Sequence, residues 1–313
     1  MGRRIGWTLA GAGLTAAALT AGMVVATEGH RATTVSPSVS AVSASPSPSL
    51  SPSPDDTAVS PVASTEPLPD LSSVAGEVSA AVTAASSGTS VGFVLYDRES
   101  DKELASVDAD SPYYTASLVK LLIAIDEVRQ EDGTWALPDA SAVEDLTDML
   151  EGSNDAIASA FWERNGGNAI VTRTAALIGL SHTTPPTDPT QWGMAKTSAA
   201  DVVATYEYML DVIPDEVAAP LLAALAGARN PADDGWDQYF GIPDGLPGRS
   251  WQIKQGWMIL RNALVLNTTG VVSGRYVVVL LTQQPAVSSA KGRAAVTAGI
   301  KTLGPLLTQL DAT

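Results

Sequence analysis

The chain has no cysteine and only two histidines among its 313 residues. The absence of cysteine excludes disulfide bonds, thiolate metal sites, a cysteine nucleophile and the lipid-bearing cysteine of bacterial lipoproteins. His30 precedes the part of the chain that we expect to fold, so a Ser-His-acid triad would depend on His182. The two threonines and two prolines that follow His182 are typical of a helix exit. We therefore expect neither such a triad nor a histidine metal site, and no cofactor.

Basic residues are also scarce. The chain has 18 lysines and arginines against 34 aspartates and glutamates, which gives a net charge of -16. A protein that binds nucleic acid needs a basic face to neutralise phosphates. The charge balance thus excludes nucleic acid as an expected partner.

The first 70 residues have the composition of a targeting segment and a tether. Residues 1–30 contain two arginines, Arg3 and Arg4, followed by an uncharged run over 5–26, which predicts a signal peptide or a membrane anchor. The small residues ending at Ala26 offer a cleavage site, so cleavage and retention both stay open. Residues 31–70 are rich in serine and proline and predict a disordered linker. We expect a secreted or membrane-anchored, extracytoplasmic protein that touches the membrane only through its N-terminal segment.

Residues 71–313 show the hydrophobic patterns of one folded domain. Helices are predicted at both ends and throughout the middle, and strands come in two groups. The predicted strands are 90–96, 102–107, 250–260, 262–269 and 276–282; the predicted terminal helices are 71–85 and 289–310. This order predicts a mixed α/β fold with one antiparallel sheet, built from both ends of the domain and flanked by helices. An all-helical subdomain is inserted at about 127–229.

Ser117 and Lys120 stand at the beginning of an apolar run that extends to Ile125. A helix that begins near Ala116 would place both side chains on one face, one turn apart. A lysine amine can then take the serine proton, provided that burial lowers its pKa. The N-H groups at the helix start would also stabilise an oxyanion. The alternative is a chance Ser-x-x-Lys on a surface.

A second polar group follows at Glu151 to Asp155, where a loop enters a helix. Ser153 and Asn154 are the candidate functional residues of this group. Ser153 or Asp155 can equally serve as a helix N-cap. The pattern alone does not decide between these readings.

The third group is Lys254, Gln255, Gly256 and Trp257, in the first of the late strands. The lysine places a cation on one face of the strand, and the glycine allows close approach of a ligand backbone. Upstream, an aromatic group at 236, 239 and 240 is predicted to line a cleft or to form a packed loop.

The order and spacing of these three groups resemble the signature elements of class A β-lactamases and penicillin-binding D-alanyl-D-alanine peptidases. The resemblance extends over residues 71–313. It implies that Ser117 is the acylated nucleophile and Lys120 its general base, with Lys254 receiving a substrate carboxylate. It further implies an oxyanion site between the N-H groups of Ser117 and Trp257. The implied substrates are a small molecule or peptide, either a β-lactam or a peptidoglycan stem peptide.

The middle motif departs from the family pattern and can be placed in two frames. If Ser153 is the motif serine, Asn154 and Asp155 reverse the usual Asp-Asn order. If Asn154 and Asp155 anchor the motif instead, Gly152 occupies the serine position. The first frame keeps a hydroxyl for proton delivery to the leaving nitrogen, and the second loses it unless Ser153 substitutes. Asn154 is expected to contact the substrate.

Two further departures concern turnover. Gln255 replaces a hydroxyl residue, and its amide can donate to a substrate carboxylate but cannot relay a proton. The loop 183–196, where a class A enzyme carries the deacylating glutamate, has only Asp188, in a turn-like Thr-Asp-Pro context. We therefore expect an acyl-enzyme that deacylates slowly. The alternative is a catalytically impaired domain that binds or scaffolds wall peptides.

Overall fold

The computed structural model describes residues 70–312, which fall within the second of two compact units, 63–313. The signal or anchor predicted over 1–30 and the linker predicted over 31–70 therefore lie outside the described residues, apart from position 70. Within residues 70–312, no helix has both the length and the hydropathy that a membrane crossing requires.

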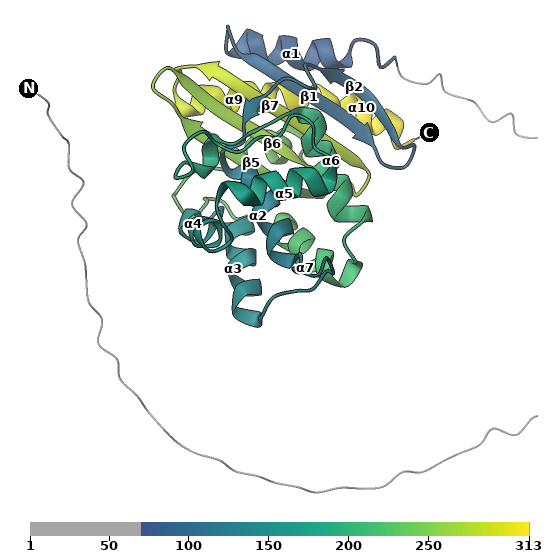
Figure 1. Ribbon diagram of the computed structural model, residues 1–313. Helices are drawn as coiled ribbons and strands as arrows, with labels where there is room; N and C mark the ends of the chain where they lie inside the picture. Colours follow the sequence, from purple (N-terminus) through teal and green to yellow (C-terminus); the bar gives the residue numbers. More distant parts are fainter. Residues whose placement is uncertain (1–69, 313) are drawn as a thin grey trace, which may run out of the picture. The chain divides into compact units, whose positions relative to one another are not determined.

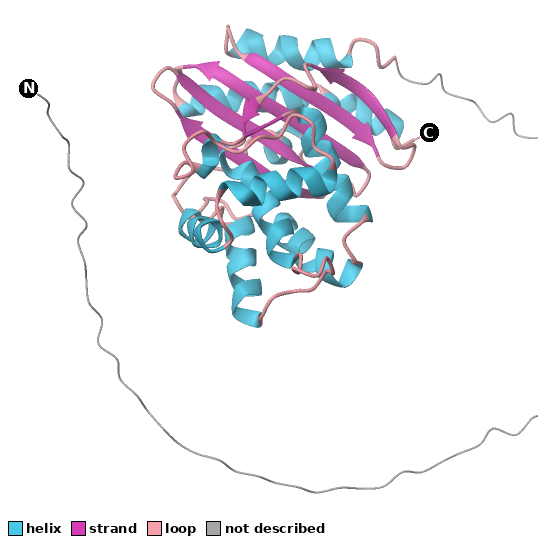
Figure 2. Cartoon of the chain, viewed as in Figure 1, coloured by secondary structure: helices cyan, strands magenta, loops and turns pink. Residues whose placement is uncertain are grey.

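The domain is organised around one five-stranded sheet (Figures 1 and 2). Its spatial order is β2-β1-β7-β6-β5, and every neighbouring pair is antiparallel. The strands are β1 (Ser90–Asp97), β2 (Lys102–Val107), β5 (Trp251–Ile259), β6 (Ala263–Val272) and β7 (Tyr276–Pro285). Because β1 pairs with β7, the early hairpin and the late strands share one sheet, as the sequence predicted.

Three helices cover one face of the sheet. They are α1 (Val74–Ala85), α9 (Ser289–Lys301) and α10 (Leu303–Leu310). The last two were predicted as a single helix over 289–310. Pro305 has no N-H to continue the hydrogen-bond ladder of α9, and proline is tolerated only in the first turn of a helix. The chain therefore ends α9 at Lys301 and starts a new helix at Leu303.

The other face of the sheet carries the helical part of the domain. Its helices are α2 (Val119–Val128), α3 (Ala140–Glu151), α4 (Asp155–Arg164), α5 (Asn168–Ile178), α6 (Ala199–Asp211) and α7 (Asp215–Ala226). Smaller elements are β3 (Tyr113–Tyr114), β4 (Lys196–Thr197), the 3-10 turns η1 (Ala116–Leu118) and η2 (Trp192–Met194), and α8 (Ile242–Gly245). The two-residue strands β3 and β4 pair with each other beside the start of α2.

Strand β7 shows why the run from Val277 to Leu281 is continuously apolar. Val277 and Val279 pack into the core shared with the helical part, whereas Val278 and Leu280 pack into the core beneath α1 and α9. Alternate residues of a strand point to opposite faces, so a stretch that lies between two apolar cores is apolar at every position. The sheet thus separates two hydrophobic cores and forms a rigid wall behind the polar residues at its edge.

Helix α2 is central to the hydrophobic core that the sheet shares with the helical part of the domain. Every residue of α2 except Glu127 is buried, including Lys120. A helix that is apolar on all sides is stable only when neighbours surround it. The 3-10 turn η1 that leads into α2 carries the predicted nucleophile Ser117 and is also buried.

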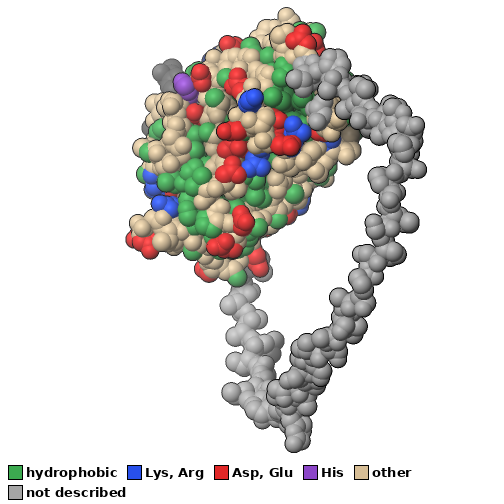
Figure 3. All heavy atoms as spheres, turned by 90° about the vertical axis from the view of Figure 1, so that its right-hand side faces the viewer, with side chains coloured by type: hydrophobic (Ala, Val, Ile, Leu, Met, Phe, Trp, Pro, Cys, Tyr) green, Lys and Arg blue, Asp and Glu red, His purple; other side chains and the backbone are tan. Residues whose placement is uncertain are grey.

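The outer surface is predominantly acidic in character. Acidic side chains are distributed across the face in Figure 3, and basic side chains lie among them. This distribution agrees with the net charge of -16. The face shown presents no stripe of positive charge that could follow a phosphate backbone.

Candidate active site

Ser117 lies in the 3-10 turn η1, immediately before α2. The helix was predicted to begin near Ala116, but Ala116 has a φ of 44° and α2 begins at Val119. A positive φ at a residue other than glycine is strained backbone, and such strain concentrates at functional sites. Residues three apart eclipse in a 3-10 turn, so Ser117 and Lys120 still share one face.

A buried amide holds the nucleophile turn against the sheet. Asn267, in β6, donates from Nδ2 to the carbonyl oxygens of Tyr114 at 2.9 Å and Thr115 at 3.3 Å. Its Oδ1 accepts from the N-H of Thr282 in β7. Asn267 is fully buried, so these bonds form away from competing water. The turn that carries Ser117 is thus tied directly to two strands.

The amine of Lys120 contacts the Ser117 hydroxyl and two of the three polar residues of the middle motif. Its Nζ donates to Ser117 Oγ at 3.0 Å and to Ser153 Oγ at 3.2 Å. It also forms an ion pair with Asp155 Oδ1 at 2.6 Å and donates to the Ser153 carbonyl at 2.6 Å. Lys120 has no exposed surface, whereas the Asp155 side chain is 65% exposed. An amine and a serine hydroxyl are therefore in direct contact at a buried position, the arrangement that the sequence predicts for a base and its nucleophile.

Burial lowers the pKa of Lys120, because desolvation penalises the charged amine. The Asp155 carboxylate, and more distantly Asp234 and Asp233, oppose this shift. Burial lowers the pKa of Lys254 well below its ordinary value, and the nearby charge of Lys120 adds to the effect. Because the charge on one amine disfavours a charge on the other, Lys120 and Lys254 titrate as a coupled pair.

Ser153 lies between the two lysines. Lys254 Nζ donates to Ser153 Oγ at 2.9 Å, and Lys120 reaches the same oxygen from the other side. Ser153 has a φ of 55°. The preceding position is crowded, because a Cβ on Gly152 would lie 2.3 Å from Arg229 Nη2. The geometry favours the frame in which Ser153 is the motif serine, because its hydroxyl occupies the centre of the site.

The other two residues of the middle motif point in different directions. Asn154 caps α4, since its Oδ1 accepts from the N-H of Ile157 at 3.0 Å and its Nδ2 donates to Asp233. Its expected contact with a substrate therefore remains a prediction. Asp155, which was considered only as a cap or a motif position, faces Lys120 instead.

Strand β5 brings Lys254 and Gly256 to the site but turns Gln255 away from it. Lys254 is 1% exposed, so its ammonium lies behind Ser153 rather than on an open surface. The expected contact of Gln255 with a substrate carboxylate is corrected by the structure. Its Nε2 donates to the carbonyls of Gln238 and Phe240, and the side chain is fully buried.

Gly256 permits close contact between β5 and the nucleophile turn. A Cβ at this position would lie 2.7 Å from the carbonyl oxygen of Thr115, which is a backbone atom and cannot easily move. β5 is the edge strand of the sheet, and an edge strand leaves part of its N-H groups without ladder partners. The predicted oxyanion site of Ser117 and Trp257 requires such a free N-H.

A cavity of about 330 Å³ opens beside the nucleophile. Its lining includes Ser117, Asp155, Trp192 and Trp257. No lysine or arginine is among the residues that line it. The cavity is large enough for a small acyl donor.

None of the three predicted aromatic residues is among those that line the cavity at Ser117. Trp236 stacks on Trp257, with ring centroids 5.8 Å apart, and Trp257 Nε1 donates to Asp234. Of this pair only Trp257 lines the cavity. Tyr239 and Phe240 instead belong to a packed loop, because the Tyr239 hydroxyl donates to a backbone carbonyl and Phe240 is buried.

The loop 183–196 contributes residues 190–193 to the lining of the cavity. Asp188 accepts hydrogen bonds from the N-H and the hydroxyl of Thr190, as expected for a turn residue. The ring of Trp192 lies 5.0 Å from Lys120 Nζ, a cation-π distance. Trp162 donates to the carbonyl of Pro189 and fixes the loop. The loop therefore supplies an aromatic wall, not a carboxylate, beside the nucleophile.

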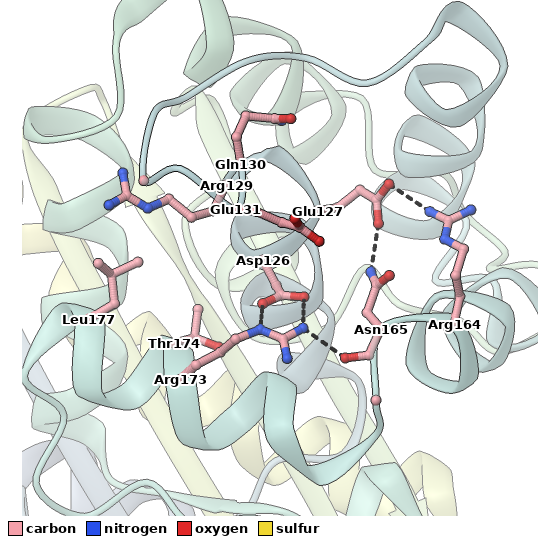
Figure 4. A pocket seen from close by; sticks show the side chains of 12 residues that line it. Asp126, Glu127, Arg129, Gln130, Glu131, Arg164, Asn165, Arg173, Thr174 and Leu177 are labelled. Carbon is pink, nitrogen blue, oxygen red and sulfur yellow. Dashed lines mark hydrogen bonds and ion pairs between the residues drawn. The ribbon is translucent and has the colours of Figure 1, made fainter.

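A larger hollow of about 840 Å³ lies at the far end of α2 (Figure 4). Arg173 forms an ion pair with Asp126, and Arg164 pairs with Glu127 across it. None of the predicted site residues lines this hollow. Its charges neutralise one another, and it places no nucleophile beside a base. Among residues 70–312, no group of three histidine, aspartate or glutamate side chains is arranged to hold a metal ion.

Three residues at the site were missed by sequence reasoning: Asp155, Trp192 and Asn267. Asp155 left a signal in the reversed order of the middle motif, which places an acid where an amide was expected. Trp192 and Asn267 left none, because their roles depend on contacts with residues that lie far away in the chain.

Comparison with solved structures identifies the fold. A β-lactamase from Xanthomonas campestris superposes with a TM-score of 0.62 at 17% identity, over 75% of this chain and 98% of that chain. A β-lactamase from Desulfarculus baarsii gives 0.59 at 17% identity, over 76% and 98%. A class A β-lactamase representative from Bacteroides cellulosilyticus gives 0.60 at 11% identity, over 77% and 99%. At these identities the similarity establishes the class A β-lactamase fold.

Comparison of sequences identifies the family, although no family model matches the chain. The protein named "Putative lipoprotein LppW" from Mycobacterium tuberculosis H37Rv is 36% identical over 230 residues. The aligned region covers 71% of this chain and 72% of that protein, and the protein of the same name from Mycobacterium bovis aligns equally well. This chain therefore belongs to the family of the mycobacterial LppW proteins, on a domain with the class A β-lactamase fold.

Proposed function

We propose that this chain is an exported serine hydrolase in which Ser117 forms a covalent acyl-enzyme with a β-lactam or a cell-wall peptide. The observation that carries the proposal is the 3.0 Å contact between Lys120 Nζ and Ser117 Oγ in a buried setting. A neutral amine at this position can accept the hydroxyl proton as the oxygen attacks a carbonyl carbon. Burial lowers the pKa of Lys120 and so increases the neutral fraction.

Ser153 is the proposed proton donor to the leaving group. A serine hydroxyl has two acceptor positions and one hydrogen. Lys120 and Lys254 both donate to Ser153 Oγ, which leaves the hydroxyl hydrogen free to be transferred. In this account Lys254 acts mainly through Ser153, and its charge attracts a substrate carboxylate through space.

The backbone N-H groups of Ser117 and Trp257 are the proposed oxyanion site. Ser117 lies at the start of a helix, and Trp257 lies on the edge strand directly after Gly256. Donors held rigidly at the position where charge develops are a major source of catalytic power. The close approach of β5 to η1 at Gly256 supports this pairing.

Slow deacylation is part of the proposal. The loop 183–196 contributes Trp192 to the site, while Asp188 is engaged with Thr190 in a turn. A hydrolytic water therefore receives no base from this loop, and full loss of a general base costs roughly 10² to 10⁴ in rate. The acyl-enzyme should therefore persist, as in a penicillin-binding protein rather than an efficient β-lactamase.

The relatives support an extracytoplasmic location, since their name includes the word lipoprotein. This chain has no cysteine to carry a lipid. We propose that the uncharged run at 5–26 serves as the export signal or anchor, and that residues 31–70 tether the domain.

Labelling with a fluorescent penicillin, followed by denaturation, tests the proposal. The wild-type domain should keep the label through a denaturing gel, and Ser117→Ala should not. Equal labelling of both proteins would assign the adduct to another nucleophile. A folded wild-type domain that takes up no label from penicillin or from a D-alanyl-D-alanine peptide ester would favour the non-catalytic binding domain.

A further inference from the structure

Asp155 is the only carboxylate among the residues that line the cavity at Ser117. It is the first residue of α4, and its side chain is 65% exposed toward that cavity. Its Oδ1 lies 2.6 Å from Lys120 Nζ, which itself lies 3.0 Å from Ser117 Oγ. These contacts limit the separation of Asp155 Oδ1 from Ser117 Oγ to at most about 5.6 Å, the span of roughly two hydrogen bonds.

A separation within this limit allows one water molecule to bridge Asp155 and an acyl group on Ser117. A water bonded to Asp155 would lie within reach of an acyl carbon attached to Ser117 Oγ. The cavity of about 330 Å³ provides the room, and the exposed carboxylate gives the water a route in from solvent. Asp188, the only acid of loop 183–196, is committed to the turn with Thr190 and does not line this cavity.

We propose that Asp155 is the general base that activates water for hydrolysis of the acyl-enzyme. This inference rests on the proposed function of Ser117. The water oxygen bonds to the acyl carbon while one of its O-H bonds breaks, and Asp155 takes that proton. Asp155 then passes this proton to the neutral amine of Lys120 across their 2.6 Å contact, and Lys120 gives it to Ser117 Oγ as the bond from the acyl carbon to Oγ breaks.

The relay restores the resting state without any further reactant. Asp155 is again a carboxylate and Lys120 a neutral amine, the states from which acylation begins. One water is consumed, one carboxylic acid is released, and the serine hydroxyl is regenerated. The ion pair also explains why hydrolysis is slow, because the carboxylate must share its lone pairs between Lys120 and the water.

This role differs from that of the usual base of the fold. The acid stands in the middle motif, where the resemblance predicts an amide, and not in the loop 183–196. An uncharged residue with an oxygen acceptor could fill the position of Asp155 and keep the contact to Lys120. Its replacement by asparagine keeps the shape and removes the ability to accept a proton.

The test uses p-nitrophenyl acetate as a small acyl donor and follows release of nitrophenol. The initial burst reports acylation of Ser117, and the later linear phase reports deacylation. Asp155→Asn should still give a burst, while its linear phase should fall at least about a hundredfold, the scale of a lost general base. Asp188→Asn is the matched control, because asparagine can still accept from Thr190, and its linear phase should equal that of wild type.

A second variant separates proton transfer from folding or positioning. In Asp155→Ala, added sodium formate should restore the linear phase in a saturable manner, because an external carboxylate can occupy the vacated site. A linear phase of Asp155→Asn equal to wild type, or no rescue of Asp155→Ala by formate, would overturn the assignment and leave Lys120 as the base for both steps. Absence of a Ser117-dependent burst in the wild type would instead overturn the proposed function itself.

Discussion

Replacing Lys254 with methionine should stabilise the protein and impair acylation at the same time. Lys254 is 1% exposed, and the hydrogen bond of its Nζ is to Ser153 Oγ at 2.9 Å. Methionine has a similar length and no amine. The variant therefore removes the buried titratable group while largely keeping the packing of β5.

The pH dependence of stability gives the sign and size of the first effect. Burial and the charge of Lys120 depress the pKa of Lys254 in the folded state, whereas the unfolded chain keeps a value near 10.5. Between these two pKa values the unfolded state binds one more proton, so wild-type stability rises with pH by up to about 1.4 kcal/mol per pH unit. Methionine carries no proton and lacks this contribution. Lys254→Met should thus be the more stable protein at pH 7, by a margin that shrinks as the pH approaches 10.5.

Urea unfolding of both proteins at pH 7, 8 and 9 measures the effect. Lys102→Met, which changes an exposed lysine in β2, is the control and should keep the pH slope of wild type. In the same preparations, acylation of Ser117 should be about 1–3 kcal/mol poorer in transition-state free energy for Lys254→Met, the scale of leaving a buried hydroxyl, here Ser153 Oγ, without its hydrogen-bond partner. Two results would refute the reasoning. One is that the unfolding free energy of Lys254→Met changes with pH as steeply as that of wild type. The other is that Lys254→Met is less stable than wild type by several kcal/mol at pH 7. Either result would mean that the lysine serves the fold and not the site.

Further variants probe the base, the close approach at β5 and an ion pair remote from the site. Lys120→Ala should reduce acylation nearly as much as loss of Ser117, and the double variant should be no worse, because nucleophile and base act as one unit; additive losses would contradict this. Gly256→Ala should slow acylation about a hundredfold while the domain stays folded. The reason is that the new Cβ would lie 2.7 Å from the Thr115 carbonyl oxygen and displace the turn that carries Ser117. An unchanged burst rate would show that acylation does not require the close approach of β5. Asp97→Asn should cost about 2 kcal/mol in urea unfolding at pH 7, because the Arg275 guanidinium lowers the pKa of Asp97 to about 2. That contribution is present above the ordinary pKa near 3.8 and is lost as pH falls through about 2, so the deficit should close in acid.

The fold was largely predictable from the sequence because its signals are local. The apolar runs of β7 and α2 indicate elements buried on all sides, and the two groups of strands at the ends of the domain require one shared sheet. The break between α9 and α10 was missed, although Pro305 marks it. The β3-β4 pair was missed because two residues are too few to show a period.

The site was predictable only where its residues act through spacing along the chain. Ser117 and Lys120 are three positions apart, and any helical turn brings them together. The ion pair of Lys120 with Asp155 and the orientation of Gln255 depend on how separate elements dock. The positive φ of Ala116 leaves no trace in composition, since alanine is a common helix residue.

Peptide mass spectrometry of the acylated protein tests the central claim most directly. The wild-type protein is treated with a penicillin, quenched in acid and digested, and the peptide that contains Ser117 is examined for the mass of the bound drug. The account predicts that this peptide carries one equivalent of drug, and that unmodified peptide predominates when Lys120 is replaced by alanine. A drug adduct located on another serine, such as Ser153, or the absence of any adduct from the folded protein, would contradict it.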